Sequence, residues 1–353
     1  MLTLTTPRHG DLLSPADGRL DGDRLYVTVR GTAPCQSLVT VNGQTVNADA
    51  GRFAVEVPVD EPTTRLAASC GELRRSVTVH RSLTADRVYR FSTDDNIDWL
   101  RDLATAPDDY PSLFDHPCLH FWQQLRSHFV VRVQHNIYWT NQASFDLSQM
   151  PDRWRGEFAD HADWLRLTFH AYADEPARPY ATAGYDEVGA DYDRVTTEIA
   201  RFAGEHSLSS YTTLHWGAAT AEGCRALADR GLHGLAGYFH ASGDQPSVAY
   251  HLDADTTTHL AARDAWRDPE LGLWFVKHDL VSNCWPPEQI RPQLDAVLAN
   301  PHRRQLMEVM IHEQYFRPES RYYQPDVHQR VVETVGWLSE HGYRSVLWEE
   351  VLP

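Results

Sequence analysis

The feature that most constrains the fold is a change of pattern near residue 85. Before it, short runs of alternating apolar and polar residues are separated by turn signals. After it, β-type runs alternate with amphipathic helical segments. The first pattern predicts an all-β sandwich, and the second predicts a parallel sheet whose strands are joined by crossover helices. We therefore expect two domains, residues 1–82 and residues 86–353.

The first region reads as a small antiparallel domain. Asn42-Gly43 lies between two β-branched runs, which is the strongest short-range signal for a hairpin. A region of this size with such spacing is typical of an immunoglobulin-like sandwich. No cluster of catalytic side chains lies in it, so we expect an accessory packing or binding domain. Its clearest strands are expected at residues 24–31, 37–48, 51–59 and 74–82.

The second region has about the 250 residues that are usual for a β/α barrel. Strands are expected at residues 88–93, 130–139, 164–172, 211–216, 234–239, 273–279, 306–316 and 343–350. Amphipathic helices are expected at residues 191–206, 220–231, 286–300 and 325–342.

Charge and composition narrow the range of partners. The formal net charge is −17 and no run of basic residues forms a stripe, which argues against nucleic acid or an anionic membrane as partner. No apolar run is long enough to span a bilayer. The N-terminus does not resemble a signal peptide, so we expect a cytoplasmic protein, or a secreted one if a leader has been removed. Cys35 and Cys70 could pair across a sandwich, but reduced thiols are expected in the cytoplasm.

Polar side chains follow five of the expected barrel strands at the point where each strand ends. The carboxyl ends of barrel strands meet at one rim, which is where such barrels place their active sites. Asp and His together suit Zn²⁺ or another divalent first-row metal. The sequence therefore predicts a metal and proton-transfer site built from Asp94-Asp95, His170, His215, His278-Asp279 and His312-Glu313.

The adjacent carboxylates of Asp94 and Asp95 pose a geometric question. Successive residues of a strand point to opposite faces, so both can reach one site only if the backbone turns between them. One Asp would ligate the cation while the other takes a proton from water. The competing interpretation is a turn and a helix N-cap, since Asp is favoured there.

The stretch "RFSTDDN", residues 90–96, resembles the T-F-D-D motif of the polysaccharide deacetylase (NodB-homology) family of carbohydrate esterases. The resemblance implies that Asp94 is the general base and that Asp95 binds the metal. The closing segment, residues 306–352, is similar to the last motif of the family, which implies that His312 is the general acid. The implied fold is the distorted β/α barrel of that family.

The third metal ligand is left between two residues. The family's second motif is H-(S/T)-x-x-H, whereas this chain has "HAYAD", with Asp174 four residues after His170. On a helix, residues four apart lie on one face, so Asp174 could replace the second His. His215 is the competing candidate. We expect Asp95 and His170 as ligands, with either His215 or Asp174 as the third.

The leading prediction is a hydrolase with one divalent metal, zinc, that removes acetyl groups from an N- or O-acetylated carbohydrate. Trp216, Asp279 and Glu313 are expected to contact the substrate. One alternative is a glycoside hydrolase that uses Asp94 and Glu313 without a metal. The other is a degenerate barrel that binds sugar without turnover.

Overall fold

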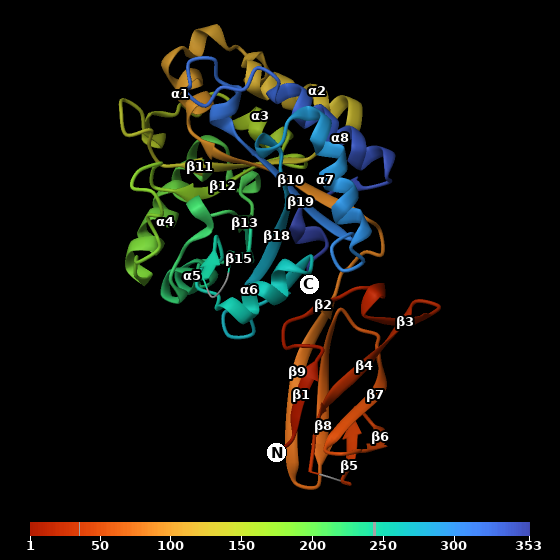
Figure 1. Ribbon diagram of the computed structural model, residues 1–353. Helices are drawn as coiled ribbons and strands as arrows, with labels where there is room; N and C mark the ends of the chain where they lie inside the picture. Colours follow the sequence, from red (N-terminus) through yellow and green to blue (C-terminus); the bar gives the residue numbers. More distant parts are fainter. Residues whose placement is uncertain (35, 243–244) are drawn as a thin grey trace. The chain divides into compact units, whose positions relative to one another are not determined.

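The computed structural model describes residues 1–34, 36–242 and 245–353, and Figure 1 shows the course of the chain. Cys35 lies outside the described residues, so its pairing with Cys70 stays untested, and Cys70 is a buried free thiol. The chain divides into two units. The first comprises Met1–Ala85, Ala265–Trp274 and Glu349–Pro353, and the second comprises Asp86–Asp264 and Phe275–Trp348.

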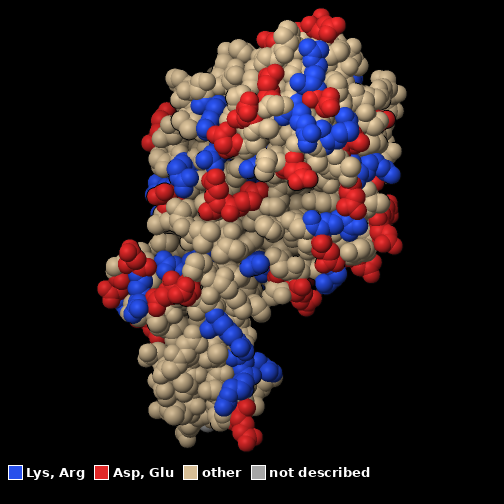
Figure 2. Space-filling model, turned by 180° about the vertical axis from the view of Figure 1, so that it is seen from behind, with Lys and Arg blue, Asp and Glu red and all other residues tan. Residues whose placement is uncertain are grey.

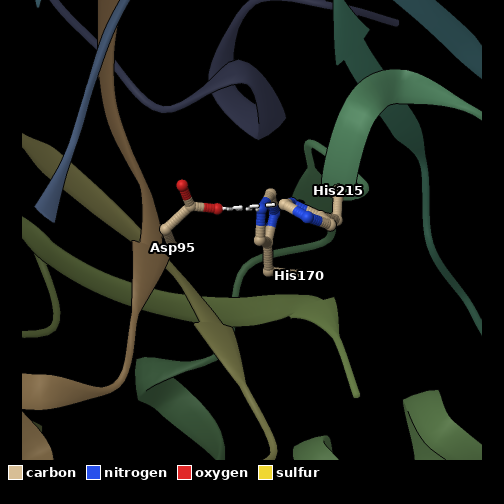
Figure 3. Close-up of side chains that lie close together, drawn as sticks. All are labelled: Asp95, His170 and His215. Carbon is tan, nitrogen blue, oxygen red and sulfur yellow. Dashed lines mark hydrogen bonds and ion pairs between the residues drawn. The ribbon is translucent and has the colours of Figure 1, made fainter. Parts of the chain in front are cut away.

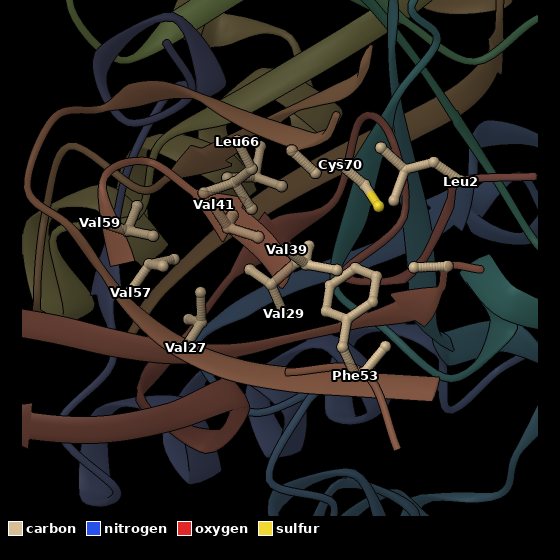
Figure 4. Packing of buried hydrophobic residues seen from close by; sticks show 14 of the residues in the cluster. Leu2, Val27, Val29, Val39, Val41, Phe53, Val57, Val59, Leu66 and Cys70 are labelled. Atoms are coloured by element: carbon tan, nitrogen blue, oxygen red, sulfur yellow. The ribbon is translucent and has the colours of Figure 1, made fainter. Parts of the chain in front are cut away.

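The first unit contains two sheets packed on one apolar core (Figure 4). One sheet is antiparallel and consists of β1 (Thr3–Thr6), β3 (Gly18–Asp21), β4 (Arg24–Thr32) and β7 (Arg52–Val59). The other sheet consists of β2 (Leu12–Leu13), β5 (Leu38–Val41), β6 (Gln44–Asn47), β8 (Thr63–Cys70) and β9 (Leu73–Arg81). This sheet is mixed, because β2 runs parallel to β9. A 3-10 turn, η1 (Pro15–Asp17), precedes β3.

The core of this unit follows the alternation of its strands. Along β4, Val27 and Val29 are buried while their neighbours are more exposed, as expected for period-two side chains. Val39 and Val41 of the facing sheet are fully buried beside them in the same cluster. The expected hairpin at Asn42-Gly43 is confirmed: both residues have positive φ (45° and 86°), the conformation of a type I′ turn between β5 and β6.

Two short segments that we had expected in the second domain belong to the first unit. The backbone N–H of Arg267 donates to the carbonyl of Gly10 at 2.9 Å, and the indole of Trp274 lies edge-on to His80 with ring centroids 5.0 Å apart. The C-terminal Pro353 accepts a hydrogen bond from the Trp274 indole at 3.0 Å. These contacts draw residues distant in sequence into the β unit.

The second unit is a nearly closed barrel. Its path of neighbouring strands is β12 (Leu165–Ala171), β11 (Val133–Tyr138), β10 (Val88–Asn96), β19 (Leu306–His312), β18 (Trp274–Val281), β14 (Gly234–Gly237) and β13 (Tyr211–Thr212). The pairings of β10 with β11 and β19, and of β11 with β12, are parallel. At the two ends of the path, the N–H of Ser209 donates to the carbonyl of Leu167 at 2.9 Å. The expectation of parallel strands at the barrel core is therefore confirmed. Short strands add to this framework: β20 (Arg344–Ser345) beside β10, and the pair β15 (His240–Ser242) and β16 (Gln245–Ser247). The short strand β17 (Ala265–Arg267) lies in a segment of the first unit.

Eight helices are formed by the described residues: α1 (Asp98–Thr105), α2 (Pro117–Phe129), α3 (Arg155–Asp160), α4 (Tyr185–Phe202), α5 (Ala221–Ala228), α6 (Ala254–Ala261), α7 (Pro287–Ala299) and α8 (Val327–Glu340). The four expected helices are α4, α5, α7 and α8. The other four were not anticipated, and α2 ends where Val130 adopts a left-handed conformation, so the following strand starts later than expected.

Several strands are shorter than their apolar runs predicted. The run at 211–216 forms only the two residues of β13, and His215 lies in the 3-10 turn η6 (His215–Gly217). The run at 306–316 stops at His312, where η8 (Glu313–Phe316) begins. Among the described residues, none of the helices has the length and apolar character needed to cross a bilayer. On the face in Figure 2, acidic and basic side chains are interspersed over the larger unit.

Candidate metal centre

The site begins with a distortion at the end of β10. Asp95 has φ of +62°, and the register of β10 against β11 shifts between Thr93 and Asn96. The amide of Asn96 stabilises this bulge by donating to the carbonyl oxygens of Thr93 (2.7 Å) and Asn136 (3.0 Å). Asp tolerates the left-handed region better than most residues do. The turn required between Asp94 and Asp95 is therefore present.

Three potential ligands converge on the carboxyl end of the barrel strands (Figure 3). One donor atom each from Asp95, His170 and His215 lies within 4.8 Å of the others. Nε2 of His170 is 3.0 Å and Nδ1 of His215 is 3.3 Å from the same oxygen, Oδ1 of Asp95. One carboxylate oxygen and two imidazole nitrogens match the donors that first-row divalent metals prefer.

In both His170 and His215, the ring nitrogen that points away from Asp95 faces a backbone carbonyl oxygen. Nδ1 of His170 donates to the carbonyl of Thr213 (2.5 Å), and Nε2 of His215 donates to that of Asp174 (3.1 Å). A carbonyl only accepts, so in each neutral ring the other nitrogen carries the lone pair. Both lone pairs then face the Asp95 oxygen. Such a convergence is repulsive unless a proton or a cation lies between them, and metal-ligating His residues show the same outer contacts.

The pKa shifts of the side chains in this cluster also indicate that it favours a positive charge. Burial alone would raise the pKa of Asp95, but His170 and His215, which hydrogen-bond the carboxylate when their inner nitrogens carry a proton, outweigh burial and hold the pKa well below its usual range. Burial would lower the pKa of His170, yet the charges of Asp94 and Asp95 raise it. Burial, followed by the charge of Asp95, raises the pKa of the Tyr138 hydroxyl.

Asp94 is the buried neighbour of the cluster. Its side chain accepts a hydrogen bond from Nδ2 of Asn136 at 2.5 Å, and burial raises its pKa. In the parallel pairing of β10 with β19, its register partner is His312. Nδ1 of His312 lies 2.9 Å from Oδ1 of Asn283, an acceptor, so this nitrogen carries a proton. The second ring nitrogen, Nε2, is then the one available for proton exchange with a ligand.

A buried chain of polar side chains leads to Asp94 from inside the barrel. Glu308 and Arg90 form a two-point ion pair with N–O distances of 2.8 and 2.9 Å. Arg90 donates to Gln134 (2.9 Å), whose amide donates to Oδ1 of Asn136 (2.7 Å). The donor on Oδ1 requires Nδ2 of Asn136 to face Asp94. The orientation of Asp94 thus depends on side chains deep in the core.

Four residues near the site were missed by the sequence analysis: Tyr138, Gln314, Asn136 and Asn283. The hydroxyl of Tyr138 donates to Oδ1 of Asp95 at 2.5 Å, and Nε2 of Gln314 donates to Oδ2 of Asp95 at 2.7 Å. Tyr138 is next to last in the strand expected at residues 130–139, so its position was a usable signal. Gln314, Asn136 and Asn283 gave no such signal in the sequence, because the role of an uncharged amide side chain depends on the partners that it contacts in the folded chain.

Of the predicted substrate contacts, Trp216 lies next to the cluster. It follows His215 directly, has φ of +62°, and is 50% exposed. The guanidinium of Arg178 lies over its ring at 5.7 Å. An exposed indole beside a polar cluster provides an apolar platform for a ligand.

Glu313 lies close by but its oxygens are engaged. Oε2 accepts the backbone N–H groups of Ile97 (2.7 Å) and Asp98 (3.0 Å), and Oε1 accepts that of Trp99 (2.7 Å). The carboxylate therefore caps the N-terminus of α1, where orphan N–H groups need acceptors. Burial, with the nearby charge of Asp98, raises the pKa of Glu313 to about 8.

Asp279 and Asp174 are placed differently from the expectation. Asp279 is buried, pairs with Arg303 at 2.7 Å, and accepts the N–H of Glu308, far along the strand from the cluster. The helical argument for Asp174 is wrong, because His170 lies in strand β12, which ends at Ala171, and the chain then bends. The Asp174 side chain is 67% exposed, with Oδ1 3.5 Å from Nε2 of His215, the nitrogen that faces away from Asp95.

His278 also lies outside the cluster. Its ring is buried in β18, with Nε2 3.3 Å from the hydroxyl of Thr213. Burial, assisted by the positive charges of Arg90 and Lys277, places its pKa well below the usual value. The residue is thus a neutral imidazole of the barrel interior.

Comparison with known proteins leaves the family open. No family model matches the chain, and no curated protein sequence is similar to it. Solved structures that resemble it include a family 4 acetyl xylan esterase from Clostridium thermocellum (13% identity, 75% of this chain and 89% of that chain, TM-score 0.37). Others are a putative polysaccharide deacetylase from Mycobacterium smegmatis (14%, 72% and 83%, TM-score 0.38) and a 4-alpha-glucanotransferase from Thermococcus litoralis (11%, 75% and 40%, TM-score 0.43). Similarity at this level assigns no activity.

Proposed function

We propose that the chain is a metal-dependent hydrolase that removes acetyl groups from an N- or O-acetylated carbohydrate. The observation that carries this proposal is the convergence of Asp95, His170 and His215, with both imidazole lone pairs directed at one carboxylate oxygen. A proton-transfer pair, Asp94 and His312, belongs to the same strand ends.

The proposed ligands of the cation, zinc, are Asp95, His170 and His215. The donor set fits, since catalytic zinc sites combine three protein ligands of this kind with an open position. When bound, the cation supplies Lewis-acid activation of a carbonyl group and of water. Gln314 holds the second oxygen of Asp95 and so fixes the orientation of that ligand.

The remaining residues have distinct proposed roles. Asp94 accepts a proton from the attacking water, and Asn136 holds its carboxylate in place. His312 delivers a proton from Nε2 to the leaving oxygen or nitrogen, because Asn283 occupies its Nδ1. Trp216 offers its exposed ring to the apolar face of a sugar.

The glycoside hydrolase alternative is disfavoured by Glu313. A catalytic carboxyl group needs an oxygen directed at the glycosidic bond. Both oxygens of Glu313 already accept backbone N–H groups at the start of α1. A sugar-binding barrel without turnover remains an outcome of the experiment below.

For residues 1–82, we propose an accessory domain of immunoglobulin-like type. Its support is the packing of two largely antiparallel sheets on one core, in a region of suitable length. The deacetylase-like barrel, formed within residues 86–353 by Asp86–Asp264 and Phe275–Trp348, would hold the catalytic site.

The test of the function begins with the metal content of the purified full-length chain. We expect one equivalent of metal, lost in Asp95→Ala, His170→Ala and His215→Ala, because a site with three protein ligands tolerates the loss of one poorly. Asp174→Ala is the matched control and should retain the metal. Full occupancy in Asp95→Ala would contradict the proposal.

The second part of the test measures acetate release from acetylated xylan and acetylated chito-oligosaccharides. The native chain should release acetate from at least one class, and release should stop when a chelator removes the metal. Metal binding together with sugar binding but no acetate release would favour the non-catalytic barrel.

A further inference from the structure

The hydroxyl of Tyr138 lies among the proposed metal ligands. Tyr138 ends β11, and its side chain is 2% exposed. Its Oη is 2.5 Å from Oδ1 of Asp95 and 2.8 Å from Nδ1 of His215, the two donor atoms assigned to the cation. Its ring packs against both imidazoles, with centroids 5.0 Å from His170 and 5.3 Å from His215.

These distances place Oη within the space that a coordination sphere occupies. Ligand atoms about 2.0–2.2 Å from a tetrahedral cation are roughly 3.3–3.6 Å from one another. Oη is closer than this to two donor atoms. A cation that binds Asp95 and His215 on the side of the phenol would come within bonding reach of Oη after a shift of the side chain, and the packing of the buried ring keeps the oxygen on that side.

We propose that Tyr138 is a fourth protein ligand of this site and binds the cation through its phenolate oxygen. The inference rests on the proposed metal site and deepens it. As the metal–oxygen bond forms, the phenol proton passes to solvent. Asp95 and Tyr138 then provide two anionic oxygens, which balance the charge of a divalent cation. Water or a substrate carbonyl would then need a further position on the cation, which zinc sites can provide by becoming five-coordinate.

The alternative is that Tyr138 acts only as a hydrogen-bond donor to Asp95. The two roles predict different spectra. A phenolate bound to Fe³⁺ or Cu²⁺ gives a visible charge-transfer band and phenolate modes in resonance Raman spectra, whereas a phenol hydrogen-bonded to a ligand gives neither.

The experiment titrates Fe³⁺ and Cu²⁺, as spectroscopic probes, into the metal-free full-length chain, and Zn²⁺ for affinity. We expect the band in the native chain and its loss in Tyr138→Phe. We also expect Zn²⁺ affinity to fall by more than about 100-fold in that variant, beyond the 10–100-fold typical of an outer hydrogen-bond partner. The matched control is Tyr343→Phe, which removes another buried hydroxyl, one that donates to the carbonyl of Arg304 at 2.7 Å. The control should keep both the band and the affinity.

The outcomes separate this inference from the proposed function. If the native chain binds none of the three metals, both fall. If it binds Zn²⁺ at Asp95, His170 and His215 but shows no phenolate modes, Tyr138 is not a ligand while the proposed hydrolase stands. The Raman measurement uses the native chain, so it decides the question even if Tyr138→Phe does not fold.

Discussion

At the scale of single residues, the site depends on one backbone conformation. Left-handed φ at Asp95 turns two consecutive carboxylates toward one cluster, at a cost of roughly 1–2 kcal/mol that the surrounding hydrogen bonds offset. The sequence was sufficient to require a turn between Asp94 and Asp95. It did not indicate that Asn96 would stabilise the turn, because that contact depends on the carbonyl of a neighbouring strand.

The two aspartates should respond differently to substitution. Asp94→Asn should keep the metal and lose about 10²–10⁴-fold in kcat, because an amide is nearly isosteric but accepts no proton from water. Asp95→Asn should instead weaken metal binding, since it removes a negative charge from the ligand set. Metal content and kcat on a substrate that the native chain hydrolyses provide the measurement. If the pair serves only as a turn and cap, both variants should be mild, since Asn caps about as well as Asp.

At the scale of secondary-structure elements, the 3-10 turn η6 holds two neighbouring residues of the proposed site. It directs His215 inward to the cluster and leaves Trp216 outward in a left-handed conformation. An apolar run at 211–216 predicted a strand, and strand periodicity alone would place these two side chains on opposite faces as well. The tight turn was not predictable, because it depends on Gly217, whose N–H donates to the carbonyl of Leu214 at 2.7 Å.

Trp216→Gly tests whether this conformation serves a ligand. Glycine adopts positive φ without strain, but it also raises the conformational entropy of the unfolded chain. These two effects should roughly cancel, so the free energy of unfolding should stay within about 0.5 kcal/mol of that of the native chain. Metal content should not change, whereas KM for the sugar should rise roughly tenfold through loss of the aromatic surface. Trp216→Phe is the matched control and should recover part of the affinity. An unchanged KM in Trp216→Gly would remove Trp216 from the substrate site.

At the scale of the whole molecule, the sequence predicted the change from β sandwich to barrel because hydrophobic periodicity extends over many residues. It did not predict that Ala265–Trp274 and Glu349–Pro353 would join the first unit, since those segments have no periodicity that distinguishes them. The sequence also did not predict the buried series of hydrogen bonds from Glu308 through Arg90 to Asn136. Each member reads as an ordinary polar residue of a strand until the barrel brings their side chains together.

Buried neutral imidazoles should make the barrel sensitive to acid. His135 is fully buried beneath the Asp94-Asp95 bulge, and burial lowers its pKa from 6.5 to about 3. Between these values the unfolded chain binds a proton that the folded chain excludes, so stability is complete above pH 6.5 and falls as the pH is lowered toward 3. The loss per pH unit is up to about 1.4 kcal/mol for this group. Urea denaturation between pH 6.5 and 5, followed by tryptophan fluorescence, should show this slope because Trp99 and Trp122 flank the imidazole.

His135→Gln isolates the contribution of this one imidazole. The variant should be less stable than the native chain at pH 7, because Thr93 and Asn96 lose the imidazole nitrogen that they contact at 2.7 and 3.0 Å. Its free energy of unfolding should nevertheless decline less steeply toward pH 5, because one excluded proton has been removed. Some slope should persist, since His278 is also buried and neutral. The exposed His128 supplies the control, and His128→Gln should keep the native slope. Equal slopes for His135→Gln and the native chain would mean that acid weakens the barrel through other groups, with the carboxylates around Asp94 as the next to test.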